Sequence, residues 1–277
     1  MYLPIILYQE TLSYLSSRRL IFSLLLIFIP AACGIWFSSM MYHHPSIIAR
    51  MTAGWIREVT PKTCIMVYLD VAVFPIALTA IINASDFIAG ERTRGMLQLL
   101  ASKPLGRWEI VVGKYLSFIS IFLVLILLKL SIFNIGLKFL GIGPVENRVF
   151  LSYLVVLVLT GIVYTSIATL SSTLTRTTLA AILAGFLLLI AWYIFDWMIL
   201  YLPVSTSDIL EKFSLSYYIE NIIGYISKGE APLLLRGGVS SKGSLGILLK
   251  SMGVVGCLTL IPVAVSTVIV QRKDIAQ

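Results

Sequence analysis

Residues 91–114 read ERTRGMLQLLASKPLGRWEIVVGK, and charges crowd together here between two long apolar runs, Cys64–Ala84 and Ile110–Phe133. Within the stretch, apolar residues recur at helical spacing as far as Pro104, which cannot continue a helix. A second helix is predicted to open near Trp108, because tryptophan suits the boundary between membrane and water. The stretch is therefore predicted to be a polar helical hairpin between two membrane spans.

Two interpretations of this hairpin are open from its residues alone. It holds enough basic residues to fix the topology of the chain through the positive-inside effect, namely Arg92, Arg94, Lys103, Arg107 and Lys114. It also holds an apolar patch that would stay exposed unless a soluble partner or lipid covered it, formed by Met96, Leu97, Leu99 and Leu100.

The composition of the 277-residue chain excludes an ordinary soluble domain, since 58% of the residues are hydrophobic and 12% are charged. The net charge of +8 is spread over short clusters between apolar runs, so lipid headgroups or an acidic protein are expected partners and nucleic acid is not. The sequence predicts an all-α membrane protein with six transmembrane helices, at Leu20–Tyr42, Cys64–Ala84, Ile110–Leu137, Phe150–Ser171, Leu179–Leu202 and Leu245–Val270.

Two further helices are predicted outside the spans. The first nineteen residues carry an apolar stripe that predicts an amphipathic helix lying in the membrane interface, formed by Ile5, Tyr8, Leu12 and Leu15. An outer amphipathic helix is predicted over Ile209–Ile223, between the fifth and sixth spans, and a Gly/Ser-rich loop at Gly237–Gly243 follows it.

No catalytic motif is present in the sequence. Gly106–Lys114 contains a Gly-Lys pair, but its glycine spacing is wrong for a phosphate-binding loop and Tyr115 replaces the residue that would hold Mg²⁺. His43 and His44 follow two methionines, a soft-metal pattern, but no carboxylate or thiolate completes the site nearby, so no metal is expected. The chain is not expected to be an enzyme.

Three ionisable residues lie within the predicted spans, at a similar depth in the outer half: Asp70, Lys129 and Asp196. Each costs about 2.5–3.5 kcal/mol near the bilayer centre, so exposure to lipid is unfavourable. We expect Lys129 to pair with Asp70 or Asp196. Such a pair would either hold spans together or gate a cargo path.

The hairpin resembles the cytoplasmic segment of permease subunits in the type-2 family of ABC exporters. The family pattern is a Glu-Arg pair, Gly-x-Leu, a further Leu, a Pro, an Arg, and Gly-Lys leading into the next span. With Asp86 upstream, the matching positions are Glu91, Arg92, Gly95, Leu97, Leu100, Pro104, Arg107, Gly113 and Lys114. The resemblance implies a coupling helix that touches an ATPase subunit, with Leu97, Leu99 and Leu100 as apolar anchors and Glu91 and Arg92 as polar contacts.

The resemblance also implies one permease domain over residues 1–277, in the cell membrane with both termini cytoplasmic. The chain would form a homo- or heterodimer of permeases, and ATP and Mg²⁺ would be bound by a separate ATPase. One alternative is a transporter or channel driven by an ion gradient, with Asp70, Lys129 and Asp196 as its relay and with internal repeats, which the sequence does not show convincingly. Another is a membrane anchor or assembly factor that transports nothing. The cargo is not predicted.

Overall fold

The structure, a computed structural model, describes residues 3–44, 59–95, 106–200, 210–227, 232–233, 238–239 and 244–272. Its described part contains six helices that are long and apolar enough to cross a membrane. They are α2 (Arg18–His43), α4 (Pro61–Ala84), α7 (Arg107–Phe139), α8 (Asn147–Leu174), α9 (Thr178–Leu200) and α12 (Leu245–Arg272). The predicted all-α fold with six spans is confirmed.

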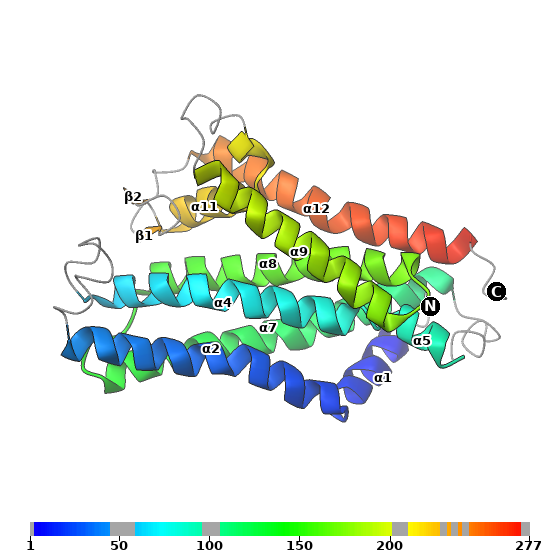
Figure 1. The fold of residues 1–277 in the computed structure, drawn as a ribbon, viewed down its shortest axis with the longest axis horizontal. Coiled ribbons are helices and arrows are strands. Elements are labelled where there is room, and N and C mark those ends of the chain that lie inside the picture. Colours follow the sequence, from blue (N-terminus) through cyan, green and yellow to red (C-terminus); the bar gives the residue numbers. More distant parts are fainter. Residues whose placement is uncertain are drawn as a thin grey trace.

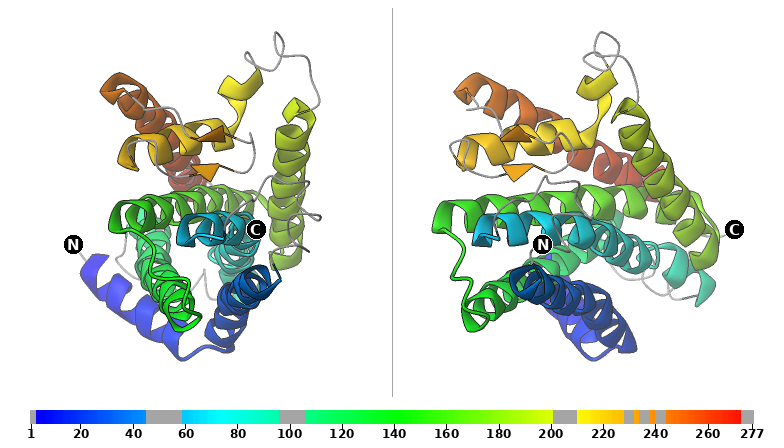
Figure 2. Two further views of the ribbon diagram at one scale, coloured as in Figure 1. Left: turned by 90° about the vertical axis from the view of Figure 1, so that its left-hand side faces the viewer. Right: turned by 60° about the vertical axis from the view of Figure 1, so that its left-hand side comes forward.

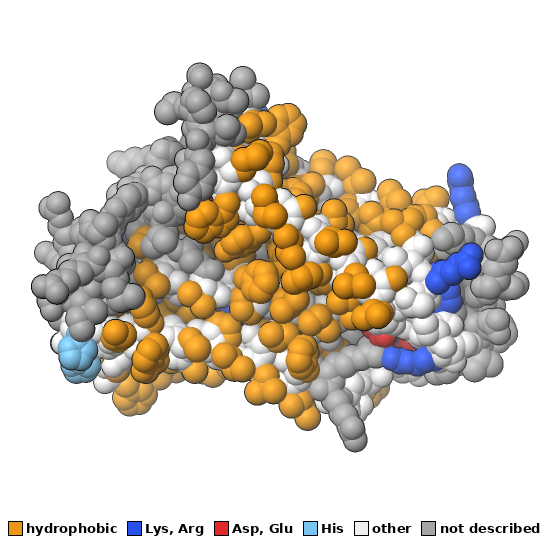
Figure 3. All heavy atoms as spheres, viewed as in Figure 1, with side chains coloured by type: hydrophobic (Ala, Val, Ile, Leu, Met, Phe, Trp, Pro, Cys, Tyr) orange, Lys and Arg blue, Asp and Glu red, His pale blue; other side chains and the backbone are white. Residues whose placement is uncertain are grey.

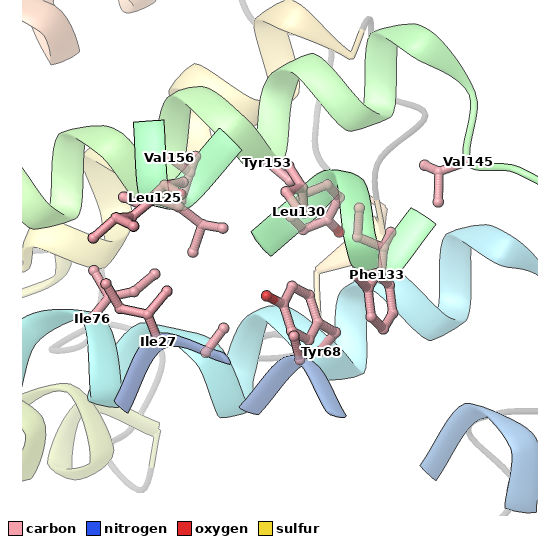
Figure 4. Packing of buried hydrophobic residues seen from close by; sticks show 14 of the residues in the cluster. Ile27, Tyr68, Ile76, Leu125, Leu130, Phe133, Val145, Tyr153 and Val156 are labelled. Carbon is pink, nitrogen blue, oxygen red and sulfur yellow. The ribbon is translucent and has the colours of Figure 1, made fainter. Parts of the chain in front are cut away.

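Helix α8 lies at the centre of the bundle and packs against α4, α7, α9 and α12 (Figures 1 and 2). Helix α2 packs on the outer side of α4 and α7. The largest buried cluster joins α2, α4, α7 and α8, and Figure 4 shows Tyr68 and Phe133 side by side within it, their rings stacked at 4.1 Å. A second cluster joins α4 and α8 to α9, α11 and α12.

The surface has the pattern of a membrane protein. On the face in Figure 3, apolar side chains cover the length of the bundle, while Lys, Arg and acidic side chains gather at one end. The start of α1 (Leu3–Leu15), the short helix α5 (Ala89–Thr93) and the C-terminal end of α12 all lie at this charged end (Figure 1). We call it the α5 end of the bundle.

Hydroxyl side chains occur along α8, and most of those that form hydrogen bonds donate to carbonyl oxygens of α8 itself. The following buried residues each donate a hydrogen bond of 2.6–2.8 Å to a carbonyl oxygen of α8 three or four residues earlier: Ser152, Thr165, Ser166, Thr169 and Thr173. Ser166 also contacts the carbonyl oxygen of Leu258 in α12 at 3.2 Å. Ser172, described below, bonds to another segment.

The predicted hairpin differs from the structure at both of its ends. Arg107 does not open a separate short helix but begins α7, which runs unbroken to Phe139 because no proline interrupts it. The helix predicted around Met96–Leu100 lies outside the described residues, and α5, which was not predicted as a separate element, ends just before it. Gly95 has φ +70°, a left-handed conformation that favours glycine.

The outer helix begins later than predicted. A 3₁₀ turn at Glu211–Phe213 precedes α11 (Leu215–Ile226), because the Ser214 side chain caps the helix by accepting from the amide of Ser216 at 3.1 Å. Two short strands that were not predicted, β1 (Pro232–Leu233) and β2 (Gly238–Val239), pair antiparallel after it. The second of them falls within the Gly/Ser-rich stretch.

Helix α1 turns its apolar stripe away from the protein. Ile5, Tyr8, Leu12 and Leu15 are all exposed. The opposite side of α1 packs on α7, where the Tyr14 ring lies edge-on to Phe118 and the Thr11 hydroxyl is 2.8 Å from that of Ser117. The break after Leu15 lets α2 leave in a new direction, as Figure 1 shows.

Candidate functional site

The candidate site is the α4–α5 segment, residues 85–94, together with the residues that hold it. Ser172 of α8 is the first of these. Its Oγ accepts from the amides of Ile88 and Ala89, both at 3.0 Å, and donates to the carbonyl oxygen of Ser85 at 2.7 Å. Ser172 is fully buried. A serine hydroxyl has one donor and two acceptor sites, so Ser172 uses all of them on this segment.

Lys114 of α7 holds the same segment from another side. Its Nζ donates to Glu91 of α5 at 3.2 Å and to Glu10 of α1 at 2.8 Å. The exposed fractions of the three side chains are 7% for Lys114, 15% for Glu91 and 33% for Glu10. One buried ammonium therefore joins α1, α5 and α7 through two charge-assisted hydrogen bonds.

The turn between α8 and α9 provides the third set of contacts. Arg92 donates to the carbonyl oxygen of Thr175 at 2.6 Å. Asp86 forms a salt bridge with Arg94 at 3.1 Å and accepts from the Thr178 hydroxyl at 3.2 Å. The bonds to Thr175 and Thr178 tie the α4–α5 segment to the end of α8 and the start of α9, and the Asp86–Arg94 salt bridge lies within the segment.

Gly90 is required by this geometry. A Cβ atom at this position would overlap the Asp86 carboxylate. The contacts of Asp86 with Arg94 and Thr178 can therefore form only because position 90 has no side chain.

The structure brings together some of the predicted site residues. Glu91 and Lys114 pair with each other, Arg92 lies beside them on α5, and Gly113 is buried in α7. The predicted anchors Leu97, Leu99, Leu100 and Pro104 lie outside the described residues, as does the side chain of Arg107. Contact of any of these residues with an ATPase stays a prediction.

Sequence reasoning missed Glu10, Ser172 and Thr178. Glu10 is the one acidic residue on the polar face of the predicted interfacial helix, which was a usable signal for a salt bridge. Ser172 had no such signal, because it is one of many serines and threonines in α8.

The predicted pairing of Lys129 with Asp196 is wrong. Both carboxylate oxygens of Asp196 are taken by α11, accepting from the Ser214 hydroxyl at 2.5 Å and from the Ser216 hydroxyl at 2.6 Å. The fully buried Lys129 ammonium instead lies 5.3 Å from the centroid of the Tyr68 ring and has no hydrogen-bond acceptor among the described residues. The side chain of Asp70 lies outside the described part, so the other pairing stays a prediction.

A bundle of six apolar helices with a charged network at one end defines a multi-pass membrane protein. The sequence matches the family model described as ABC-2 family transporter protein over residues 5–275, so the chain belongs to the ABC-2 transporter family. No curated protein matches the chain. The family membership predicted from the sequence is confirmed. The chain is the membrane permease of an ABC transporter, a subunit type that in general carries no nucleotide-binding site and works with an ATPase subunit.

Proposed function

We propose that this chain is the permease of an ABC exporter and that a separate ATPase binds it at the α5 end. The observation that carries the proposal is the network at that end. It joins α1, the α4–α5 segment, α7 and the α8–α9 turn through Lys114, Ser172 and Arg92, and it includes Glu91, Arg92 and Lys114 of the family pattern. A push on this segment would reach several spans at once.

In this proposal the α5 end faces the cytoplasm, with both chain termini on that side. The exposed stripe of α1 would then lie in the inner interface of the membrane, in contact with lipid. ATP and Mg²⁺ would be bound by the partner, and the cargo path would run between this permease and a second one, identical or related. ATP-driven closure of the ATPase pair would rock the spans and alternate access to that path.

The central experiment is co-purification of the chain with the ATPase produced alongside it. Leu97→Asp and Leu100→Asp place a charge in the apolar patch and are expected to lower ATPase recovery at least tenfold, since hot-spot residues at an interface contribute about 2 kcal/mol or more. Ser102→Asp adds the same charge to the same hairpin outside the patch and serves as the matched control. Full recovery of the ATPase with both leucine variants would contradict the proposed docking site.

The same preparation also distinguishes the ABC permease from a transporter driven by an ion gradient. A transporter driven by an ion gradient would transport in vesicles without nucleotide and would copurify with no ATPase. Orientation is measured with an impermeant thiol reagent on two otherwise cysteine-free variants, Ser16→Cys and His44→Cys, which are exposed at opposite ends of α2. Labelling of the second variant alone from outside the cell is expected, and the reverse result would overturn the cytoplasmic assignment of the α5 end.

A further inference from the structure

We infer that Ser172 is a positioning residue for coupling, which makes the α8–α9 turn move as one body with the α4–α5 segment and so transmits the action of the ATPase to α9. This inference rests on the proposed function. The family pattern runs from Glu91 into the start of the third span at Lys114 and assigns no role to the fourth or fifth span.

Ser172 acts as a helix cap supplied by another helix. The first amides of a helix have no partner within it and need an acceptor. The residue at the N-cap of α5 is Ile88, whose side chain makes no capping hydrogen bond. The Ser172 hydroxyl takes this role by accepting from the amides of Ile88 and Ala89. The start of α5 is therefore held by α8.

Three contacts follow one another along the α8–α9 turn. Ser172 binds the start of α5, the Thr175 carbonyl oxygen binds Arg92, and Thr178 binds Asp86. They fall at intervals of three residues, so they run from the last turn of α8 to the first turn of α9. The α4–α5 segment could therefore move relative to the α8–α9 turn only if all three contacts broke.

A separate route leads to α7. Lys114 joins Glu91 to α7 and α1 without using any residue of the turn. Removing the Ser172 hydroxyl would therefore weaken the route to α9 and leave the route to α7 intact. This difference distinguishes the inference from a general loss of coupling, which would affect both routes.

The test measures nucleotide-dependent distances in the complex of permease and ATPase, by pulsed electron paramagnetic resonance. Cys33, Cys64 and Cys257 are first replaced, and spin labels are placed at exposed apolar positions: Leu25 on α2, paired with Leu187 on α9 or with Leu128 on α7. Labelled permease is diluted with unlabelled permease so that only distances within one chain are read. When Ser172 is unchanged, trapping with ATP and vanadate is expected to change both the Leu25–Leu187 and the Leu25–Leu128 distance.

Ser172→Ala is expected to abolish at least half of the change in the Leu25–Leu187 distance and to leave the Leu25–Leu128 change in place. Ser171→Ala is the matched control, because the Ser171 hydroxyl donates only to the Ile167 carbonyl oxygen of its own helix. It should leave both changes intact. If Ser172→Ala also leaves both intact, the inference is wrong.

A second variant covers the case in which Ser172→Ala does not assemble. Thr178→Val removes the hydroxyl that binds Asp86 while keeping the side-chain shape. It is expected to reduce the α9 change in the same direction, and a full α9 change in this variant would overturn the inference. Failure of the proposed function gives a different result, with no nucleotide-dependent change at α7 or α9 in the unmutated coupling site and no ATPase in the preparation.

Discussion

Helix α7 carries two buried lysines about four helical turns apart, and their surroundings differ completely. Lys114, at the α5 end, meets two carboxylates from two other helices. Lys129, in the other half of the helix, is fully buried and faces the Tyr68 ring, whose hydroxyl likewise has no hydrogen-bond partner among the described residues. Among the described residues, the same residue type on the same helix thus forms a salt-bridged junction in one place and a buried ammonium without an acceptor in the other.

The difference indicates two distinct roles. An ammonium with two carboxylates gives fixed geometry to the helices it joins, and removing it leaves buried charge behind. An ammonium without an acceptor lowers stability and persists where function requires it or where the long apolar stem packs well. Substitutions at the two lysines should therefore change stability in opposite directions.

The largest expected effect is at the satisfied junction. Lys114→Met leaves Glu91 and Glu10 facing each other without a counter-charge and is expected to lower the free energy of unfolding by about 3 kcal/mol. Thermal unfolding in detergent measures this loss. Lys138→Met on the same helix is the control, since Lys138 is exposed and its loss should leave the transition unchanged. An equal response of the two variants would mean that the junction contributes nothing.

The opposite sign is expected at Lys129, which has no acceptor among the described residues. Lys129→Met removes a burial penalty of about 2.5–3.5 kcal/mol and loses a cation–π contact of about 1 kcal/mol, for a net gain of about 2 kcal/mol. The same unfolding assay reads this gain. A loss of stability instead would point to a counter-charge, and the variant Asp70→Asn, with the same loss, would identify Asp70 as that partner.

The smallest expected effect is at Tyr68, where two substitutions distinguish the contribution of the ring to stability from that of its hydroxyl. Tyr68→Phe keeps the stacking on Phe133 and removes a buried polar atom without a described partner, so stability should change by less than about 1 kcal/mol. Tyr68→Leu removes the ring as well and should destabilise clearly more. If Tyr68→Phe is as damaging as Tyr68→Leu, then the hydroxyl has a partner that matters.

The spans could be predicted from the sequence to within a few residues because the length of an apolar run and the charges that bound it set where a membrane helix begins and ends. The start of α11 could not, since it depends on Ser214 capping the helix. At the candidate site, Glu91 and Lys114 were singled out by pattern, but their pairing and the addition of Glu10 depend on how α1 packs on α7. The Asp196 pairing failed for a related reason, because the carboxylate bonds to serines of the outer helix that no local pattern connects to it.

Helix α8 stands at the centre of the bundle, yet most of its bonded hydroxyls close on its own carbonyl oxygens. Hydrogen bonds from α8 to neighbouring spans are therefore few, such as those of Ser166 with Leu258 and of Tyr115 with Ile162, and a shift of a neighbouring helix would mainly exchange van der Waals contacts. Ser172 differs in binding three backbone groups of one other segment, the α4–α5 segment on which the proposed ATPase would act. Helix α8 is therefore suited to let the surrounding spans shift along it, while Ser172 keeps its end moving together with the α4–α5 segment.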